Sequence, residues 1–168
     1  MPERKTMERA QRDKREGKAP TTQAGEFVRE EMEHIRKGKH GARSTKQAVA
    51  IGLSKARRAG VKLPPPAAGR TSEKTRKSAE RAYEKGQRGD TEPNAKRSRA
   101  RVGVLKREAH GAASKRALSR QAKTAASKRS ASSRSAAARK AVKTKGPAKR
   151  SAAARKGART RAARRRRG

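Results

Sequence analysis

Apolar residues recur at helical spacing in two neighbouring stretches, and these stretches predict two amphipathic helices. In residues 23–37 the apolar positions that share one side of a helix are Phe27, Val28, Met32 and Ile35. In residues 44–63 a broader face consists of Ala48, Val49, Ile51, Gly52, Leu53, Ala56 and Ala59. Each helix therefore has a face to bury, and neither is long enough to be stable alone.

The second stretch also carries end signals. Ser44 is a favourable N-cap, and Gln47 stands where its side chain can reach back to the Ser44 amide in a capping box. Gly60 stands where a left-handed residue commonly ends a helix. The prolines at 64–66 then prevent the helix from continuing.

A short connector with Gly38 and Gly41 separates the two helices, which predicts an antiparallel αα-hairpin at residues 23–63. We expect Val61 and Leu63 to fold back over its end and Gly52 to allow a close approach of the two backbones. A unit of this size usually needs outside help, so dimerisation through the hairpin or folding on a partner is expected.

The remaining segments have weaker patterns. Residues 1–22 predict a charged N-terminal arm, and residues 64–110 a linker that begins with a stiff proline run. Weak short helices are expected within residues 71–126. Residues 111–168 predict a basic low-complexity tail, in which SAAARK at 135–140 recurs at 151–156, with Gly146-Pro147 between the copies.

Composition argues against a large core. The 168 residues include 51 Lys or Arg and 14 Asp or Glu, for a net charge of +37, with one Phe, one Tyr and no Trp. High net charge with low hydrophobicity is typical of disorder. We therefore expect a mostly α protein with extensive disorder: a small hairpin, weak helices and a disordered basic C-terminal tail whose AAARK blocks become helical once phosphates neutralise them.

The charge is unevenly distributed. Glu108 is the last acidic residue, and residues 111–168 contain 21 Lys or Arg. A few basic residues would serve only to keep the protein soluble. A segment with this many basic residues and no acidic ones predicts binding to a polyanion, and nucleic acid is the first candidate. The candidate nucleic-acid-binding residues are Lys46, Lys55, Arg57, Arg58, Lys96, Arg97, Arg99, Arg101, Lys115, Arg116, Arg120, Arg139, Lys140, Arg155, Lys156, Arg164, Arg165, Arg166 and Arg167.

Other chemistry lacks support in the sequence. No nucleophile–base pair or phosphate-binding glycine loop is present, so no enzyme activity and no cofactor are predicted. His34, His40 and His110 lack evident partner ligands, and there is no cysteine, so no metal site is predicted. No apolar run has the length of a membrane span or a signal peptide.

FVREEM at 27–32, KQAVAIGLSKARRAGVKLPPP at 46–66 and the later KRSRA, LKRE and SKRALSRQA resemble a bacterial family of small basic proteins labelled DNA-binding or of unknown function. The resemblance covers residues 27–126 and is most specific at 46–63, while the tail resembles histone-like nucleoid proteins in composition. It implies association with DNA and supplies no catalytic residues.

The expected function is histone-like, largely sequence-nonspecific binding of duplex DNA in the cytoplasmic nucleoid. An RNA- or ribosome-associated protein, or a protein-interaction hairpin tethered to nucleic acid by its tail, is the alternative.

Overall fold

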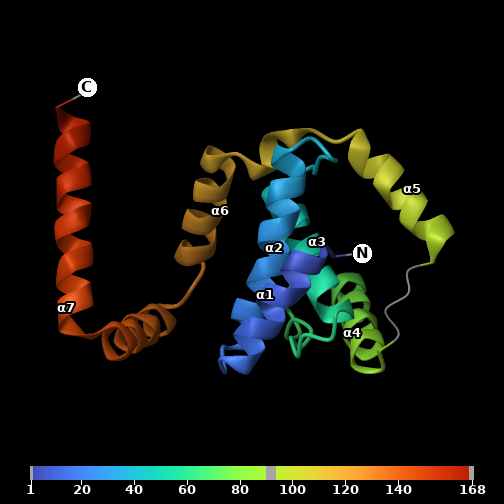
Figure 1. Ribbon diagram of the computed structural model, residues 1–168, viewed down its shortest axis with the longest axis horizontal. Helices are drawn as coiled ribbons and strands as arrows, with labels where there is room; N and C mark the ends of the chain where they lie inside the picture. The colour runs from blue at the N-terminus through green and yellow to red at the C-terminus, as the bar shows by residue number, and fades with distance from the viewer. Residues whose placement is uncertain (1, 90–93, 167–168) are drawn as a thin grey trace. The chain divides into compact units, whose positions relative to one another are not determined.

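Helices make up most of the chain in the computed structural model, which describes residues 2–89 and 94–166 (Figure 1). In order, the helices are α1 (Arg4–Arg15), α2 (Pro20–Arg36), α3 (Thr45–Arg58), α4 (Glu73–Gln87), α5 (Ala95–Lys106), the 3-10 helix η1 (His110–Ala113), α6 (Lys115–Ser127) and α7 (Ala131–Arg165). The chain divides into two compact units, residues 1–121 and residues 122–168.

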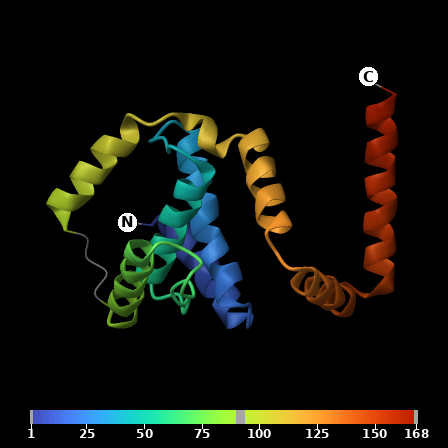
Figure 2. The same cartoon turned by 180° about the vertical axis from the view of Figure 1, so that it is seen from behind.

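In the first unit, α2 and α3 run in opposite directions and pack against each other (Figure 2). A Cβ atom at Gly52 would lie 2.7 Å from the Val28 Cα, so only glycine permits this approach. Ser44 caps α3 as predicted, since its hydroxyl accepts a hydrogen bond from the Gln47 amide at 3.2 Å. The Gln47 side chain accepts from the Arg43 amide, at 2.8 Å, instead of the Ser44 amide.

Helix α1 packs on α2, so residues 4–15 are part of the folded unit and not a free arm. Ala10 is buried in a core cluster with Phe27, and Met7 packs against the same cluster. Asp13 is also buried and accepts a hydrogen bond from Lys18 at 2.8 Å. Helix α1 packs in this way because Ala10, a small residue among polar ones, lets it lie close to α2.

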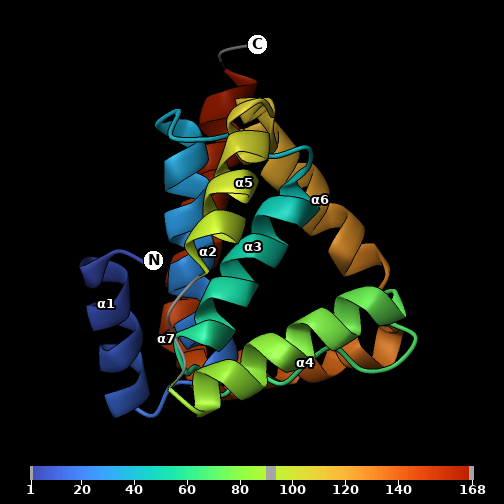
Figure 3. The same ribbon diagram turned by 90° about the vertical axis from the view of Figure 1, so that its right-hand side faces the viewer.

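The carboxyl end of α3 contacts two other parts of the unit, the chain at residues 63–64 and helix α4 (Figure 3). The Arg57 guanidinium donates to the carbonyls of Leu63 and Pro64, at 3.1 and 3.2 Å, which fastens the chain where it turns back over the core. Helix α4 packs on α3, and its Gly86 touches the Arg57 carbonyl so closely that no side chain would fit. Gly60 adopts the left-handed conformation predicted for it, with φ of 82°.

Residues 105–118 dock on the hairpin. The hydrogen bonds that hold them run from the Gly41 amide to Leu105 O (2.8 Å), from the Ala42 amide to Ala109 O (3.1 Å), from Thr45 Oγ1 to Ala112 O (2.7 Å) and from Arg36 Nε to Ala113 O (3.0 Å). Ala112 and Ala113 are buried in a second core cluster with Met32 and Ile35. The boundary predicted at residues 110/111 therefore falls inside a packed segment.

Other segments of the same chain cover the apolar faces of the hairpin. The first core cluster consists of Ala10, Ala24, Phe27, Ala56, Val61 and Leu63, and the second of Met32, Ile35, Ala42, Ala48, Ala112 and Ala113. Helix α1 and η1 contribute to them beside α2 and α3. The hairpin faces are therefore buried within one chain, and a homodimer through the hairpin stays a prediction.

The predicted extensive disorder and disordered tail are wrong. The described part of residues 111–168 is almost entirely helical, in η1, α6 and α7. Alanine, lysine and arginine all favour the helix, which satisfies backbone hydrogen bonds without any core, so low hydrophobicity did not imply loss of secondary structure. Among the described helices, α7 included, none combines the length and apolarity needed to cross a bilayer.

Helix α7 is interrupted where the sequence repeat is interrupted. Gly146 has non-helical angles, with φ of 65° and ψ of 169°, and Pro147 follows it. The two SAAARK copies, at 135–140 and 151–156, therefore lie on separate helical halves.

The substitution Gly52→Ala is expected to lower the free energy of unfolding by about 2 kcal/mol, because the new methyl group must push α2 and α3 apart. Gly25→Ala in α2 is the matched control, since a Cβ there meets nothing within 4 Å. That change should be neutral or stabilising by up to about 1 kcal/mol through helix propensity. Urea unfolding followed by circular dichroism measures both, and equal stability of the two variants would contradict the close packing at Gly52.

Candidate nucleic-acid interface

Most of the sequence-predicted contact residues are exposed on or directly after helices. These are Lys46 and Arg58 on α3, Lys96, Arg97, Arg99 and Arg101 on α5, Lys115, Arg116 and Arg120 on α6, and Arg139, Lys140, Arg155, Lys156, Arg165 and Arg166 on α7 or just after it. Arg164 belongs to α7, and Arg167 lies outside the described residues.

Lys55 and Arg57 have other partners. The Lys55 ammonium lies 2.7 Å from Glu31 Oε2 and 3.3 Å from Glu30 Oε1, and Glu31 is fully buried. Arg57 is buried and held by the two carbonyls that follow α3, and this burial lowers its pKa. Because both side chains are held inside the first unit, we leave them out of the interface proposed for this protein.

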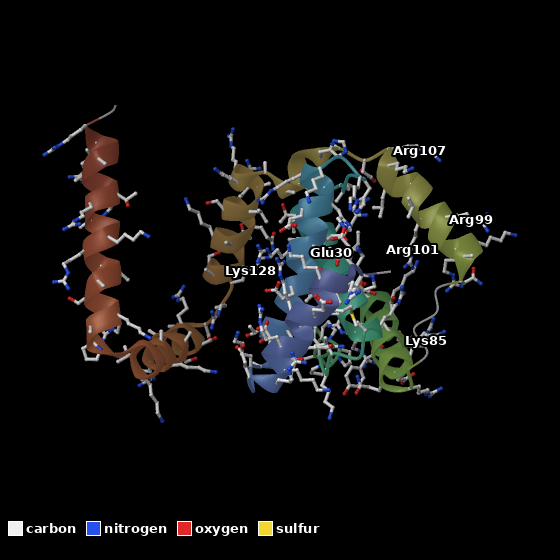
Figure 4. All side chains as sticks on the ribbon, viewed as in Figure 1. Glu30, Lys85, Arg99, Arg101, Arg107 and Lys128 are labelled. Atoms are coloured by element: carbon white, nitrogen blue, oxygen red, sulfur yellow. The ribbon has the colours of Figure 1, made fainter. Side chains whose placement is uncertain are left out.

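Arg58, Arg97 and Arg101 come close together although they belong to α3 and α5. Partial burial lowers the pKa of Arg58, and the positive charges of Arg101 and Arg97 lower it further. Figure 4 shows Arg101 on the side of α5 that faces the hairpin and Arg99 on the opposite side. Guanidinium groups that repel one another favour an anion between them, and the guanidinium group matches the oxygens of a phosphate or a carboxylate in paired hydrogen bonds. No sequence pattern indicates this grouping, since its members come from distant segments.

The acidic residues are concentrated at the start of the chain. Residues 1–36 contain 9 Lys or Arg and 8 Asp or Glu, whereas residues 37–168 contain 42 and 6. Some of these opposite charges pair with each other within a helix, as in Arg4–Glu8 on α1 (2.8 Å) and Arg29–Glu33 on α2 (3.1 Å). The nearly neutral α1–α2 pair and the strongly basic segments from α5 onward are thus chemically distinct.

Helix α7 has basic residues on all sides. Positions 149, 150, 155, 156, 159 and 161 do not follow the helical period, so no single basic stripe forms. The helix contains no Asn or Gln, the side chains that read adenine edges by paired hydrogen bonds. This arrangement suits contact with phosphates on several sides of the helix and not the reading of base sequence.

The described residues also include one group with ligand atoms close enough to hold a metal ion. Glu31 and His34 on α2 and His40 after it offer ligand atoms within 4.8 Å of one another. No metal site was predicted for these histidines, because only the fold places His40 beside the pair that Glu31 and His34 form on α2.

Comparisons with known proteins match only the hairpin. A family model described as a family of unknown function (DUF6496) matches residues 21–66, which contain α3, nearly all of α2 and the proline run. No curated protein and no solved structure matches the chain. The match brings no activity, ligand or site residue to this protein.

Proposed function

We propose that this protein binds duplex DNA by neutralising its phosphate backbone, with little sequence preference, in the manner of a histone-like protein. The observation that carries the proposal is the basic segment after Glu108, the last acidic residue: it contains 21 Lys or Arg and no Asp or Glu, and those of its Lys and Arg side chains that the structure describes are exposed. Binding of such a surface to DNA releases condensed counterions, which supplies the affinity without contacts to bases.

The helical form of the basic segment favours DNA over double-stranded RNA. The DNA major groove is about 12 Å wide and admits an α-helix. The major groove of A-form RNA is too narrow for protein side chains to read. Two helical halves of α7, with Lys and Arg on all sides, could reach phosphates on both edges of a DNA groove.

The first unit has a different part in this proposal. Its own basic group, Arg58, Arg97 and Arg101, would hold one phosphate of the same DNA. Its helices α1 and α2 together are close to neutral and would not bind the phosphate backbone of the DNA. In a cell, such a protein would be found with chromosomal DNA.

Competition binding tests the proposal. A labelled duplex bound by the full chain should be displaced equally, within about 3-fold, by two unlabelled duplexes of the same length and unrelated sequence, because backbone contacts carry no sequence information. A structured RNA of the same length should compete less well than either duplex. A strong preference for one duplex would show base reading, and stronger competition by the RNA would show that the protein is an RNA-binding one.

A further inference from the structure

The buried carboxylate of Glu31 lacks the hydrogen bonds that a buried charge requires. Its side chain is 0% exposed, and neither of its oxygens has a hydrogen-bond partner among the described residues. The Lys55 ammonium lies beside Oε2, at 2.7 Å, as an ion pair without hydrogen-bond geometry. Oε1 lies 3.4 Å from His40 Nε2. An unsatisfied buried carboxylate is costly, so Glu31 is poised to accept a further cationic partner.

Two histidines adjoin the same carboxylate. His34 follows Glu31 by three residues and therefore lies on the same face of α2. His40 arrives from the loop that follows α2, and its ring stands edge-on to that of His34, with centroids 6.0 Å apart. One ligand atom from each of the three side chains lies within 4.8 Å of the other two.

The ring of His40 is oriented as in many metal sites. Its Nδ1 lies 3.0 Å from the Gly41 carbonyl oxygen and donates to it, which leaves the lone pair on Nε2, the nitrogen that faces Glu31. A ligating histidine commonly donates its other ring N–H to a carbonyl or carboxylate in this way.

The surroundings supply further negative charge. Glu3 Oε1 lies 2.8 Å from His34 Nε2 and 2.8 Å from the Lys39 ammonium. Three carboxylates, those of Glu3, Glu30 and Glu31, meet two ammonium groups, those of Lys39 and Lys55. These five side chains together carry one negative charge, in a chain whose net charge is +37.

We propose that Glu31, His34 and His40 bind one divalent transition-metal ion, with Zn²⁺ as the ion that fits best. Two imidazole nitrogens and a carboxylate oxygen are a common protein ligand set for Zn²⁺. Bonds of about 2.0–2.1 Å in tetrahedral geometry place ligand atoms about 3.3 Å apart, so the side chains need to move by roughly 1 Å. The ion would join α2 to the loop that holds the Leu105 and Ala109 carbonyls, and would stabilise that docking.

Calorimetric titration of the full-length chain with ZnCl₂, in a phosphate-free buffer after chelator treatment, tests the site. We expect saturable binding of one ion per chain and a higher melting temperature in its presence. His34→Gln and His40→Gln should each weaken the binding by about 10-fold or more, since even the loss of an outer-sphere partner costs 10–100-fold. His110→Gln is the matched control, because His110 is exposed and outside the group, and it should bind as the unmutated chain does.

A second measurement needs no variant and covers the case in which a substitution unfolds the protein. In nuclear magnetic resonance spectra of the unmutated chain, Zn²⁺ should shift the ring signals of two histidines and leave the third unchanged. Absence of one-to-one binding, equal effects of the three histidine variants, or equal shifts of all three rings would overturn the proposal.

Discussion

Shortening the chain to residues 1–129 is expected to lower its affinity for duplex DNA by about 100-fold or more at physiological salt. The truncation removes α7 and with it 15 Lys or Arg and no acidic residue. Each lost phosphate contact also removes the release of a counterion, so the loss grows with the number of contacts. Gel shift with the full chain and the truncated chain on one duplex measures the effect, and equal affinity would show that α7 is not the main binding element.

The position of the cut decides what else is lost. Residues 1–129 keep η1, α6 and the buried Ala112 and Ala113, so the first unit should keep its helicity and its thermal unfolding. A chain that ends at residue 109 loses these alanines and the carbonyls that Thr45 and Arg36 bind, so it should unfold at a lower temperature. Circular dichroism on both truncations separates loss of binding from loss of folding.

Lys55→Ala is expected to lower the free energy of unfolding by about 3 kcal/mol, because it leaves the buried Glu31 carboxylate without its counter-ion. DNA affinity per folded molecule should not change, since Lys55 is turned toward Glu31 and Glu30. Chemical unfolding followed by circular dichroism, together with gel shift, measures the two quantities on the same protein.

Lys46→Ala is the matched control for this change, as it removes the same side chain from an exposed position of the same helix. Its effect on stability should stay within about 0.5 kcal/mol. The double variant Lys55→Met with Glu31→Gln should recover part of the lost stability, because it removes both charges together. If Lys46→Ala and Lys55→Ala destabilise equally, the ion pair does not contribute as inferred.

Local signals in the sequence predicted parts of the hairpin. The N-cap at Ser44, the left-handed conformation of Gly60 and the close approach at Gly52 each follow from the chemistry of one residue and its neighbours. Such features are encoded within a few positions and do not depend on the rest of the fold. The interruption of α7 at Gly146-Pro147 is also encoded locally, although the tail around it was predicted to be disordered.

Packing between distant segments was not predictable in this way. Ala112 and Ala113 complete the second core cluster, yet two alanines in an alanine-rich segment give no periodic signal. Lys55 and Arg58 are similar in sequence terms, and only the fold places one beside Glu31 and the other beside two arginines of α5. The prediction of a disordered tail was wrong because low hydrophobicity and high net charge exclude a large core but do not prevent a segment rich in alanine, lysine and arginine from being helical.

The central claim is that phosphate neutralisation by the exposed basic helices drives binding, and the salt dependence of affinity tests it most directly. The association constant of the full chain for one duplex should be measured at several salt concentrations and plotted as log K against log salt. Contacts to 6–10 phosphates predict a straight line with a slope of about −5 to −9, and a loss of affinity of about 10³–10⁵ between 50 and 200 mM salt. A slope near zero would contradict the account.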